Sequence, residues 1–267
     1  MDFIIIIISS VLGYLLGSIS FSRIFLKLLA PDKSMDELQL TLEESQDEIG
    51  LEMGAGANKA SIILGTKYGV IIGILDMLKI ILPLIVFRYI LFPNQPYFLY
   101  LAAFGLVGHN WPIYHRFKGG RGQSVMLGSL IVIDWLGAIL NLTFGILLAF
   151  SLFGSLILAF YLWLWMMIPW FIFRTFDINF MLYAIIVNIV IILGQIPELK
   201  LYFQLRKEGT HLEYKEKLLE TTAQLRGMKK MEDKFLSMGK WRFVIGIIIL
   251  LGLLTIYAFL PLISNFI

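Results

Sequence analysis

The segment WLGAILNLTFGILLAFSLFGSLILAFYLWLWMMIPWFIF, residues 135–173, contains no charged side chain. The hydrocarbon core of a bilayer is about 30 Å thick, and a helix needs about 20 predominantly apolar residues to cross it. This segment is therefore long enough for two crossings. Residues 125–133 and 243–267 are uncharged as well. The pattern predicts an all-α integral membrane protein, a polytopic bundle of transmembrane helices.

The composition excludes several classes of protein. Only 15% of the 267 residues are charged, whereas a soluble domain usually has about 25%. The net charge of +3 gives no support for binding nucleic acid. Because there is no cysteine, disulfides, thiolate catalysis and cysteine-ligated metals are excluded. Residues 3–16 lack a basic start and a small-residue cleavage site, so we expect a retained first span and not a signal peptide.

Hydropathy predicts about eight spans, with polar segments between them. The expected spans are residues 3–29, 60–91, 97–113, 123–135, 137–153, 155–173, 178–203 and 241–264. The acidic segment 31–58 is expected to form a loop or a short surface helix, and segment 204–240 a soluble helical connector.

Orientation follows from the enrichment of Lys and Arg in cytoplasmic loops. Placing residues 31–59, 114–122 and 204–240 in the cytoplasm puts most of the 22 basic residues there. This arrangement predicts a cell-membrane protein with both termini outside.

Polar groups within spans are costly, so each is a candidate functional residue. The first such group is GYLLGSIS, residues 13–20. Gly13 and Gly17 are four residues apart, so they share a helix face and favour close helix packing. The other interpretation is that Ser18 and Ser20 line a polar cavity.

The second group is GAGANKAS, residues 54–61, directly before the second span. A glycine-rich turn that opens a helix exposes backbone N–H groups suited to a phosphate. Lys59 and Ser61 would add donors. The alternative interpretation, a flexible loop with a helix cap, is equally open at this point.

The third group, GHNWPIYHRFKGGRG at residues 108–122, is the most specific. It leaves one expected span and enters the next, so it should lie at the membrane surface. Its glycines allow close approach of a ligand, and Lys118 and Arg121 supply positive charge for phosphate oxygens. A basic loop alone would not require these glycines. His115 is expected to be a packed interfacial residue, and no further ligands have metal spacing, so no metal is predicted.

The fourth group is Asp76 and Lys79 in the second span. Residues three apart face each other on a helix. The simpler interpretation is a buried pair that neutralises itself.

These motifs, in this order, resemble the acyl-phosphate:glycerol-3-phosphate acyltransferase family, PlsY, over about residues 8–210. Residues 17–20 are similar to the family's GSIP, residues 75–79 to its LDxLK, and residues 109–122 to its histidine segment ending in FKGGKG. The resemblance implies a seven-helix membrane core with its active site on the cytoplasmic face. An eighth span would be additional. The implied organisation is an acyltransferase-like core at 1–204, a cytoplasmic segment at 205–240 and an extra transmembrane helix at 241–267.

The chain departs from the family pattern in two places. The family's GSGNxGATN motif is followed by an arginine, which is missing after residues 54–61. Asn58 and Ser61 are both candidates for the corresponding donor, and Lys59 and Lys67 are candidates to replace the charge. At residues 196–200 the chain has IPELK, without the family's His and Asn.

The resemblance implies transfer of a fatty acyl group from acyl phosphate to glycerol 3-phosphate, giving lysophosphatidic acid and phosphate. It implies no cofactor, because acyl phosphate is already activated. The expected partners are these two substrates and membrane lipids. Ser18, His109 and Lys118 are expected to be catalytic, with Ser18 and His109 orienting the acyl carbonyl or the glycerol hydroxyl. The other expected substrate contacts are Ser20, Gly54, Gly56, Asn58, Lys59, Ser61, Gly119, Gly120, Arg121 and Gly122.

Two other functions fit parts of the sequence. One is a diverged, non-catalytic protein that binds a phosphorylated lipid, which the two departures favour. The other is a small transporter, suggested by Asp76 and Lys79 within a span. Transporters usually break their helices near the midplane, whereas the glycine-rich breaks here are expected at the surface.

Overall fold

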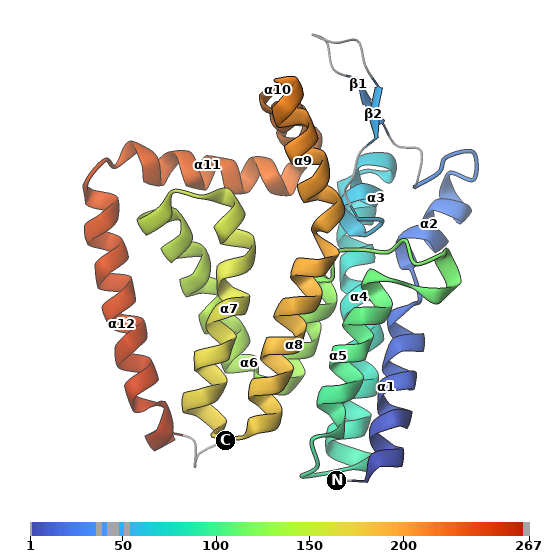
Figure 1. Cartoon of the computed structure of the whole chain (residues 1–267), viewed down its shortest axis with the longest axis vertical. Helices are drawn as coiled ribbons and strands as arrows, with labels where there is room; N and C mark the ends of the chain where they lie inside the picture. Colours follow the sequence, from blue (N-terminus) through green and yellow to red (C-terminus); the bar gives the residue numbers. More distant parts are fainter. Residues whose placement is uncertain (1, 36–38, 42–47, 51–53, 264–267) are drawn as a thin grey trace. The chain divides into compact units, whose positions relative to one another are not determined.

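The computed structural model describes residues 2–35, 39–41, 48–50 and 54–263, and they are mainly α-helical (Figure 1). The helices are α1 (Phe3–Gly17), α2 (Phe21–Leu29), α3 (Ala57–Leu64), α4 (Thr66–Ile85), α5 (Tyr97–Asn110), α6 (Gln123–Leu148), α7 (Leu156–Thr175), α8 (Ile178–Gly194), α9 (Ile196–Glu208), α10 (His211–Thr221), α11 (Ala223–Ser237) and α12 (Trp241–Ile263). Short π- or 3₁₀-helical turns are η1 (Val86–Leu91), η2 (Ile113–His115) and η3 (Ala149–Phe153). The all-α prediction is confirmed.

The acidic segment contains a short strand pair instead of the expected loop or surface helix. Strand β1 (Gln39–Thr41) pairs antiparallel with β2 (Glu48–Gly50). Most of the acidic side chains on which the expectation rested lie outside the described residues.

Five helical stretches of the described chain are long and apolar enough to cross a bilayer, or six if the bent pair α8 and α9 forms one span. The five are Phe3–Leu29, Thr66–Leu91, Gln123–Phe153, Leu156–Thr175 and Trp241–Pro261. Helix α5 has 14 residues, fewer than the roughly 20 that a full crossing needs. Within α6 the backbone is non-helical at Asp134, where φ is −158° and ψ is 88°, close to the end of the expected span 123–135. The expected number of eight spans is not confirmed.

The chain divides into two compact units. The first contains Met1–Val132 and Ile189–Ala223, and the second Ile133–Asn188 and Gln224–Ile267. The division predicted at residues 204 and 240 separates segments by function and not by compactness, and it stays a prediction.

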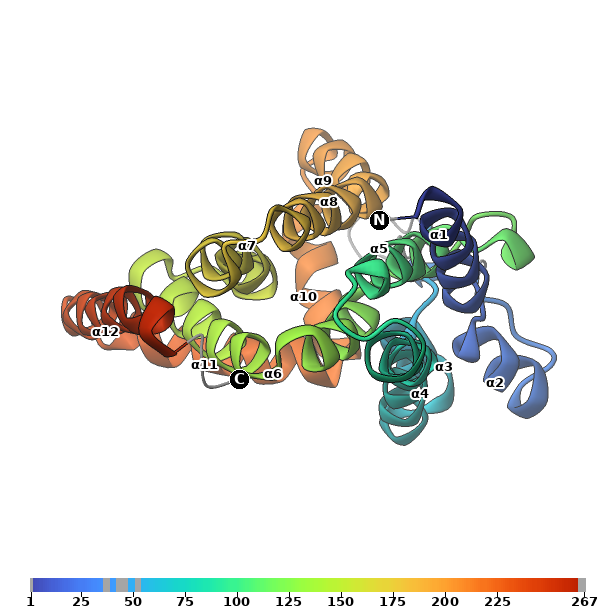
Figure 2. The ribbon, with the colours of Figure 1, turned by 90° about the horizontal axis from the view of Figure 1, so that it is seen from below.

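In the first unit, α1, α4 and α5 pack side by side (Figures 1 and 2). Glycines let the α1 and α5 backbones touch. A Cβ added at Gly13 would collide with Leu101 O, and one at Gly17 with Gly105 O. The small residues of the first span therefore serve helix packing, as one of the two interpretations predicted.

In the second unit, the C-terminal helices have specific contacts. The Tyr257 hydroxyl of α12 donates to Asn141 Oδ1 at 2.7 Å, and its ring packs edge-on against Trp170. From α11, buried Glu232 accepts a hydrogen bond from Leu156 N at 2.7 Å, where α7 begins. The segment after residue 223 is therefore part of the core of this unit.

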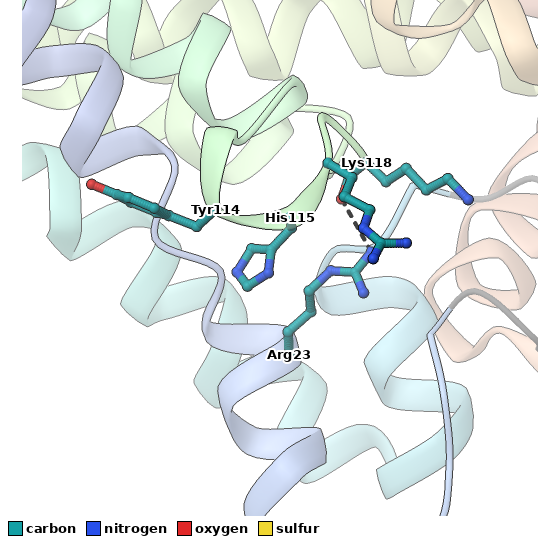
Figure 3. Close-up of a pocket in the computed structure, with 5 residues that line it drawn as sticks. Arg23, Tyr114, His115 and Lys118 are labelled. Carbon is teal, nitrogen blue, oxygen red and sulfur yellow. Dashed lines mark hydrogen bonds between the residues drawn. The ribbon is translucent and has the colours of Figure 1, made fainter.

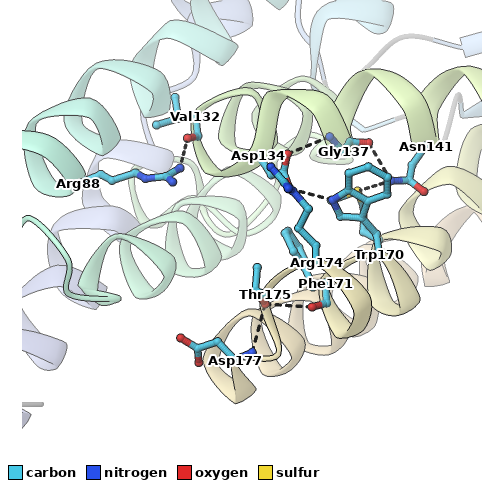
Figure 4. A network of polar contacts seen from close by, with 11 residues as sticks. Arg88, Val132, Asp134, Gly137, Asn141, Trp170, Phe171, Arg174, Thr175 and Asp177 are labelled. Carbon is cyan, nitrogen blue, oxygen red and sulfur yellow. Dashed lines mark hydrogen bonds and ion pairs between the residues drawn. The ribbon is translucent and has the colours of Figure 1, made fainter. Parts of the chain in front are cut away.

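A polar network surrounds the backbone break at Asp134 (Figure 4). Asp134 Oδ2 accepts from Trp170 Nε1 at 2.8 Å and from Arg174 Nε at 3.1 Å, and Oδ1 accepts from Gly137 N at 3.0 Å. The carboxylate caps the helix that restarts after the break and neutralises a buried arginine.

Candidate active site

The corner between α1 and α2 holds Ser18. Its hydroxyl donates to Tyr14 O at 2.8 Å, and Ile113 N approaches its Oγ at 3.4 Å. The residue has no exposed surface. The hydroxyl therefore ties the end of α1 to the loop after α5, and it does not line an open cavity, which was the other interpretation of this segment.

Lys79 of α4 forms the centre of a buried polar cluster. Its ammonium group has three protons to donate and no lone pair. Three acceptors surround it: Asp76 Oδ1 at 2.8 Å, Ile19 O at 2.6 Å and His109 Nδ1 at 3.0 Å. They come from α4, the α1–α2 corner and α5. The predicted pair of Asp76 and Lys79 is formed. Through Lys79 it also links α4 to the α1–α2 corner and to His109 of α5.

This arrangement determines the hydrogen-bonding role of His109. With Lys79 as an ammonium, which can only donate, Nδ1 of the imidazole accepts and Nε2 carries the proton. Asp76 Oδ1 lies 3.8 Å from Nδ1. His109 is also buried, with 8% of its surface exposed. In this state it is a hydrogen-bond donor and not a free base.

The glycine-rich segment folds back onto His109. Gly120 N donates to His109 O at 3.0 Å, and a Cβ on Gly120 would collide with His109 Nε2. Only a residue without a side chain permits this contact. The N–H of Gly120 is already used in this hydrogen bond, and the expected contact of Gly120 with substrate stays a prediction.

The two glycine-rich segments, residues 54–61 and 108–122, are in contact. Ala55 N donates to Gly119 O at 2.8 Å, and a Cβ on Gly54 would meet Gly120 C at 2.9 Å. Ser20 joins the same region through Ser22, because the two hydroxyl oxygens are 3.0 Å apart and Ser22 donates to Ala55 O at 2.6 Å.

The helix that follows, α3, holds three further predicted contacts. Asn58 is exposed, Lys59 is buried, and the Ser61 hydroxyl donates to Asn58 O at 2.7 Å. Gly56 caps this helix without a side-chain hydrogen bond. The predicted contacts of these residues with substrate stay predictions.

Lys118 and Arg121 are engaged differently, although they are three residues apart. Arg121 Nε donates to Glu198 Oε1 of α9 at 2.8 Å. Lys118 is exposed and lines a cavity of about 280 Å³ together with Arg23, Tyr114, His115 and Arg116 (Figure 3). Arg23 Nη2 of α2 donates to Lys118 O at 3.2 Å. Gly122, with φ of +80°, then turns the chain into α6.

Sequence reasoning missed the roles of several of these residues. Asp76 and Lys79 were recognised as a pair, but their contact with His109 depends on how α4 and α5 pack. Glu198 lies in the IPELK segment, for which the sequence gives no sign of a contact with Arg121. Arg23 lies outside the glycine-rich motifs, and its position at the start of a helix after Ser20 was the only available signal.

The sequence profile described as glycerol-3-phosphate acyltransferase matches residues 48–200. Glycerol-3-phosphate acyltransferase 1 of Oceanobacillus iheyensis is 33% identical over 153 residues, which are 55% of this chain and 66% of that protein. The glycerol-3-phosphate acyltransferase of Mycoplasma mycoides subsp. mycoides is 35% identical over 143 residues, 51% of this chain and 50% of that protein. The chain thus spans between half and two thirds of the length of these curated relatives.

Two crystal structures of PlsY, an integral membrane glycerol 3-phosphate acyltransferase, have a similar fold. The lysophosphatidic acid form aligns with a TM-score of 0.57 and 23% identity, and the glycerol 3-phosphate form with 0.59 and 22%. Each alignment covers 75% of this chain and 93% of the other. With its apolar helices, the chain is an integral membrane protein. The profile covers more than half of the chain, so the chain belongs to the glycerol-3-phosphate acyltransferase family.

Proposed function

We propose that this protein transfers a fatty acyl group from acyl phosphate to glycerol 3-phosphate, producing lysophosphatidic acid and inorganic phosphate for phospholipid synthesis. The glycerol 1-hydroxyl oxygen bonds to the acyl carbonyl carbon. The bond from that carbon to the phosphate oxygen breaks, and phosphate leaves with the electron pair. The hydroxyl proton passes to the departing phosphate. No protein nucleophile or cofactor is required.

One observation supports this proposal above the others: His109 is held by Lys79 and packed against Gly120. The family motifs therefore meet in one buried polar centre, next to the exposed Lys118. Acyl transfer from an activated donor needs oriented substrates and donors aimed at the developing negative charge. A fixed imidazole N–H and a nearby ammonium provide both.

In this scheme the residues have distinct tasks. His109 donates from Nε2 to the acyl carbonyl or to a phosphate oxygen, and Lys118 binds phosphate. Ser18 and Lys79 position the surrounding backbone and the imidazole. Arg121, which pairs with Glu198, acts on substrate only if that pair opens.

The proposed setting is the cell membrane, with the N-terminus outside and the active face in the cytoplasm. The phosphorylated acceptor would then be available from the same side. The acyl donor would enter from the bilayer.

A non-catalytic member that binds a phosphorylated lipid is the second candidate. It is favoured by the missing family arginine and by the Arg121–Glu198 ion pair, which occupies a predicted phosphate ligand. A transporter is less favoured, because the Lys79 ammonium donates to Asp76, Ile19 O and His109 and so joins α4 to the α1–α2 corner and α5.

The test uses purified protein in phosphatidylcholine nanodiscs with palmitoyl phosphate, with and without glycerol 3-phosphate. Inorganic phosphate and lysophosphatidic acid are both measured. We expect both products only when both substrates are present, and a large loss in His109→Phe and Lys118→Ala. If the protein binds glycerol 3-phosphate but forms no lysophosphatidic acid, the proposed enzymatic function is refuted and the non-catalytic alternative is supported.

A further inference from the structure

We propose that the cavity between α2 and the loop after α5 binds a phosphate monoester, with Arg23 as the second cation beside Lys118. This inference rests on the proposed function and specifies where its phosphorylated acceptor is held. It assigns to Arg23 the positive charge that the family places after the GSGNxGATN motif.

The lining of the cavity has the chemistry of an anion site. Arg23, Arg116 and Lys118 carry positive charge, and His115 and Tyr114 complete the lining. No carboxylate is among the lining residues that the structure describes. Clustered positive charge raises the local concentration of anions, and a guanidinium can bind two phosphate oxygens at once.

The size of the cavity favours a small ligand. Its volume is about 280 Å³, at the lower end of the roughly 300–1,000 Å³ typical of small-molecule sites. A phosphate group on a short polyol fits this range better than a nucleotide does. The acyl chain of the donor would have to lie elsewhere, along the apolar helices.

The loop that forms the cavity has an unusual backbone. Arg116 and Phe117 are consecutive non-glycine residues with φ of 50° and 60°. This left-handed conformation is unfavourable for residues with a Cβ, and such strain is concentrated at functional sites. Hydrogen bonds from Phe117 N to Pro112 O and from Lys118 N to His115 O, each 3.0 Å, hold it in place.

The cavity is connected directly to the buried centre through the chain. Lys118 is followed by Gly119 and Gly120, and Gly120 contacts His109. Arg23 fixes the same point from α2 by donating to Lys118 O at 3.2 Å (Figure 3). A phosphate bound by Arg23 and Lys118 would therefore be held beside the segment that carries the proposed chemistry. In this structure Arg121 is instead paired with Glu198, at 2.8 Å.

The phosphate could belong to a soluble ester or to the headgroup of an anionic lipid. The experiment therefore measures glycerol 3-phosphate binding by isothermal titration calorimetry, without acyl phosphate, in phosphatidylcholine nanodiscs. A parallel arm measures retention of phosphatidylglycerol by the purified protein. The variants are Arg23→Gln, Arg23→Lys and the control Lys27→Gln, an exposed residue on the same helix that does not line the cavity.

We expect Arg23→Gln to weaken glycerol 3-phosphate binding about tenfold or more, which is about 1.4 kcal/mol, and Arg23→Lys to weaken it less. Lys27→Gln should bind within about twofold of wild type, since one exposed charge off the site contributes little. Equal thermal midpoints would show that the variants are folded. If Arg23→Gln loses phosphatidylglycerol and keeps glycerol 3-phosphate, the phosphate is a lipid headgroup. If Arg23→Gln still binds glycerol 3-phosphate and still retains phosphatidylglycerol, the assignment of this cavity as a phosphate site is refuted.

The site and the proposed function fail in different ways. Wild-type protein that binds glycerol 3-phosphate through Arg23 but forms no lysophosphatidic acid would refute the function and keep the site. Full turnover with unaltered binding in Arg23→Gln would refute the site and keep the function.

Discussion

Each of the two units contains a buried ion pair, and the two pairs differ in the groups that satisfy their remaining hydrogen bonds. In the second unit, Asp134 faces Arg174 and accepts further hydrogen bonds from Trp170 and Gly137. In the first unit, the Asp76–Lys79 pair is completed by Ile19 O and by the imidazole of His109. A buried charge is tolerated when its hydrogen-bonding groups are satisfied. For Asp76–Lys79, one of these groups belongs to a histidine that contacts a glycine-rich loop. For Asp134–Arg174, the partners are a tryptophan and the backbone of the same unit.

The Asp134–Arg174 pair stabilises a backbone break, whereas the Asp76–Lys79 pair also holds a histidine of the candidate site. The burial of the side chains and the distance between the charged atoms do not distinguish the two pairs. What distinguishes them is the partner that completes each cluster. Substitutions at each pair can therefore break or refine the distinction.

The largest effect is expected for Lys79→Met. It leaves Asp76 buried without its cation and His109 without its donor. Removing one partner of a buried pair costs about 3–5 kcal/mol, and transfer activity should fall to background. Thermal denaturation and lysophosphatidic acid formation measure the two losses.

The double variant Lys79→Met with Asp76→Leu is the matched control. It removes both charges, so much of the stability should return. Activity should not return, because His109 still lacks its donor. Recovery of both properties would show that the first cluster is as purely structural as the second.

A smaller effect, on stability alone, is expected for Arg174→Met. Asp134 loses its cation but keeps the hydrogen bonds from Trp170 and Gly137. The expected cost is about 3 kcal/mol, with kcat/KM unchanged within about twofold. A tenfold fall in kcat/KM at an unchanged thermal midpoint would contradict the structural assignment of this network.

Gly120→Ala should have an intermediate effect on both properties. The added Cβ would overlap His109 Nε2, and overpacking of this kind costs about 1–3 kcal/mol. Activity should fall about tenfold or more, because the imidazole must move. Gly73→Ala is the control, since its Cβ would make only ordinary contacts at 3.7 Å. Equal activity in the two variants would argue against a role for the Gly120–His109 contact.

The smallest effect is expected for Arg121→Gln. Its pair with Glu198 is partly exposed, with 21% and 35% of the two side chains accessible. Such pairs contribute about 0–1 kcal/mol. The affinity for glycerol 3-phosphate, measured by calorimetry, should change less than in Arg23→Gln. A larger loss in Arg121→Gln would restore this residue as the main phosphate ligand.

The sequence was most informative where a pattern depends only on local chemistry. Uncharged segments predict helices in a membrane, and glycines at positions 13 and 17 predict close helix packing. Residues 109–122 carry the strongest resemblance to the family and predict where the site lies. Hydropathy did not predict the backbone break at Asp134 or the short length of α5. The number of spans depends on both features, which are properties of the backbone geometry.

The residues that complete the site depend on packing between distant segments. Hydropathy and motif spacing show that Asp76 and Lys79 share a helix face, but not that His109, 30 residues away, lies 3.0 Å from Lys79. They show that Lys118 and Arg121 are basic, but not that Arg121 pairs with Glu198 while Lys118 lies beside Arg23. Membrane insertion and helix formation follow from local composition and periodicity. The partners of each buried or clustered charge follow from which helices pack together, and that information exists only in the folded chain.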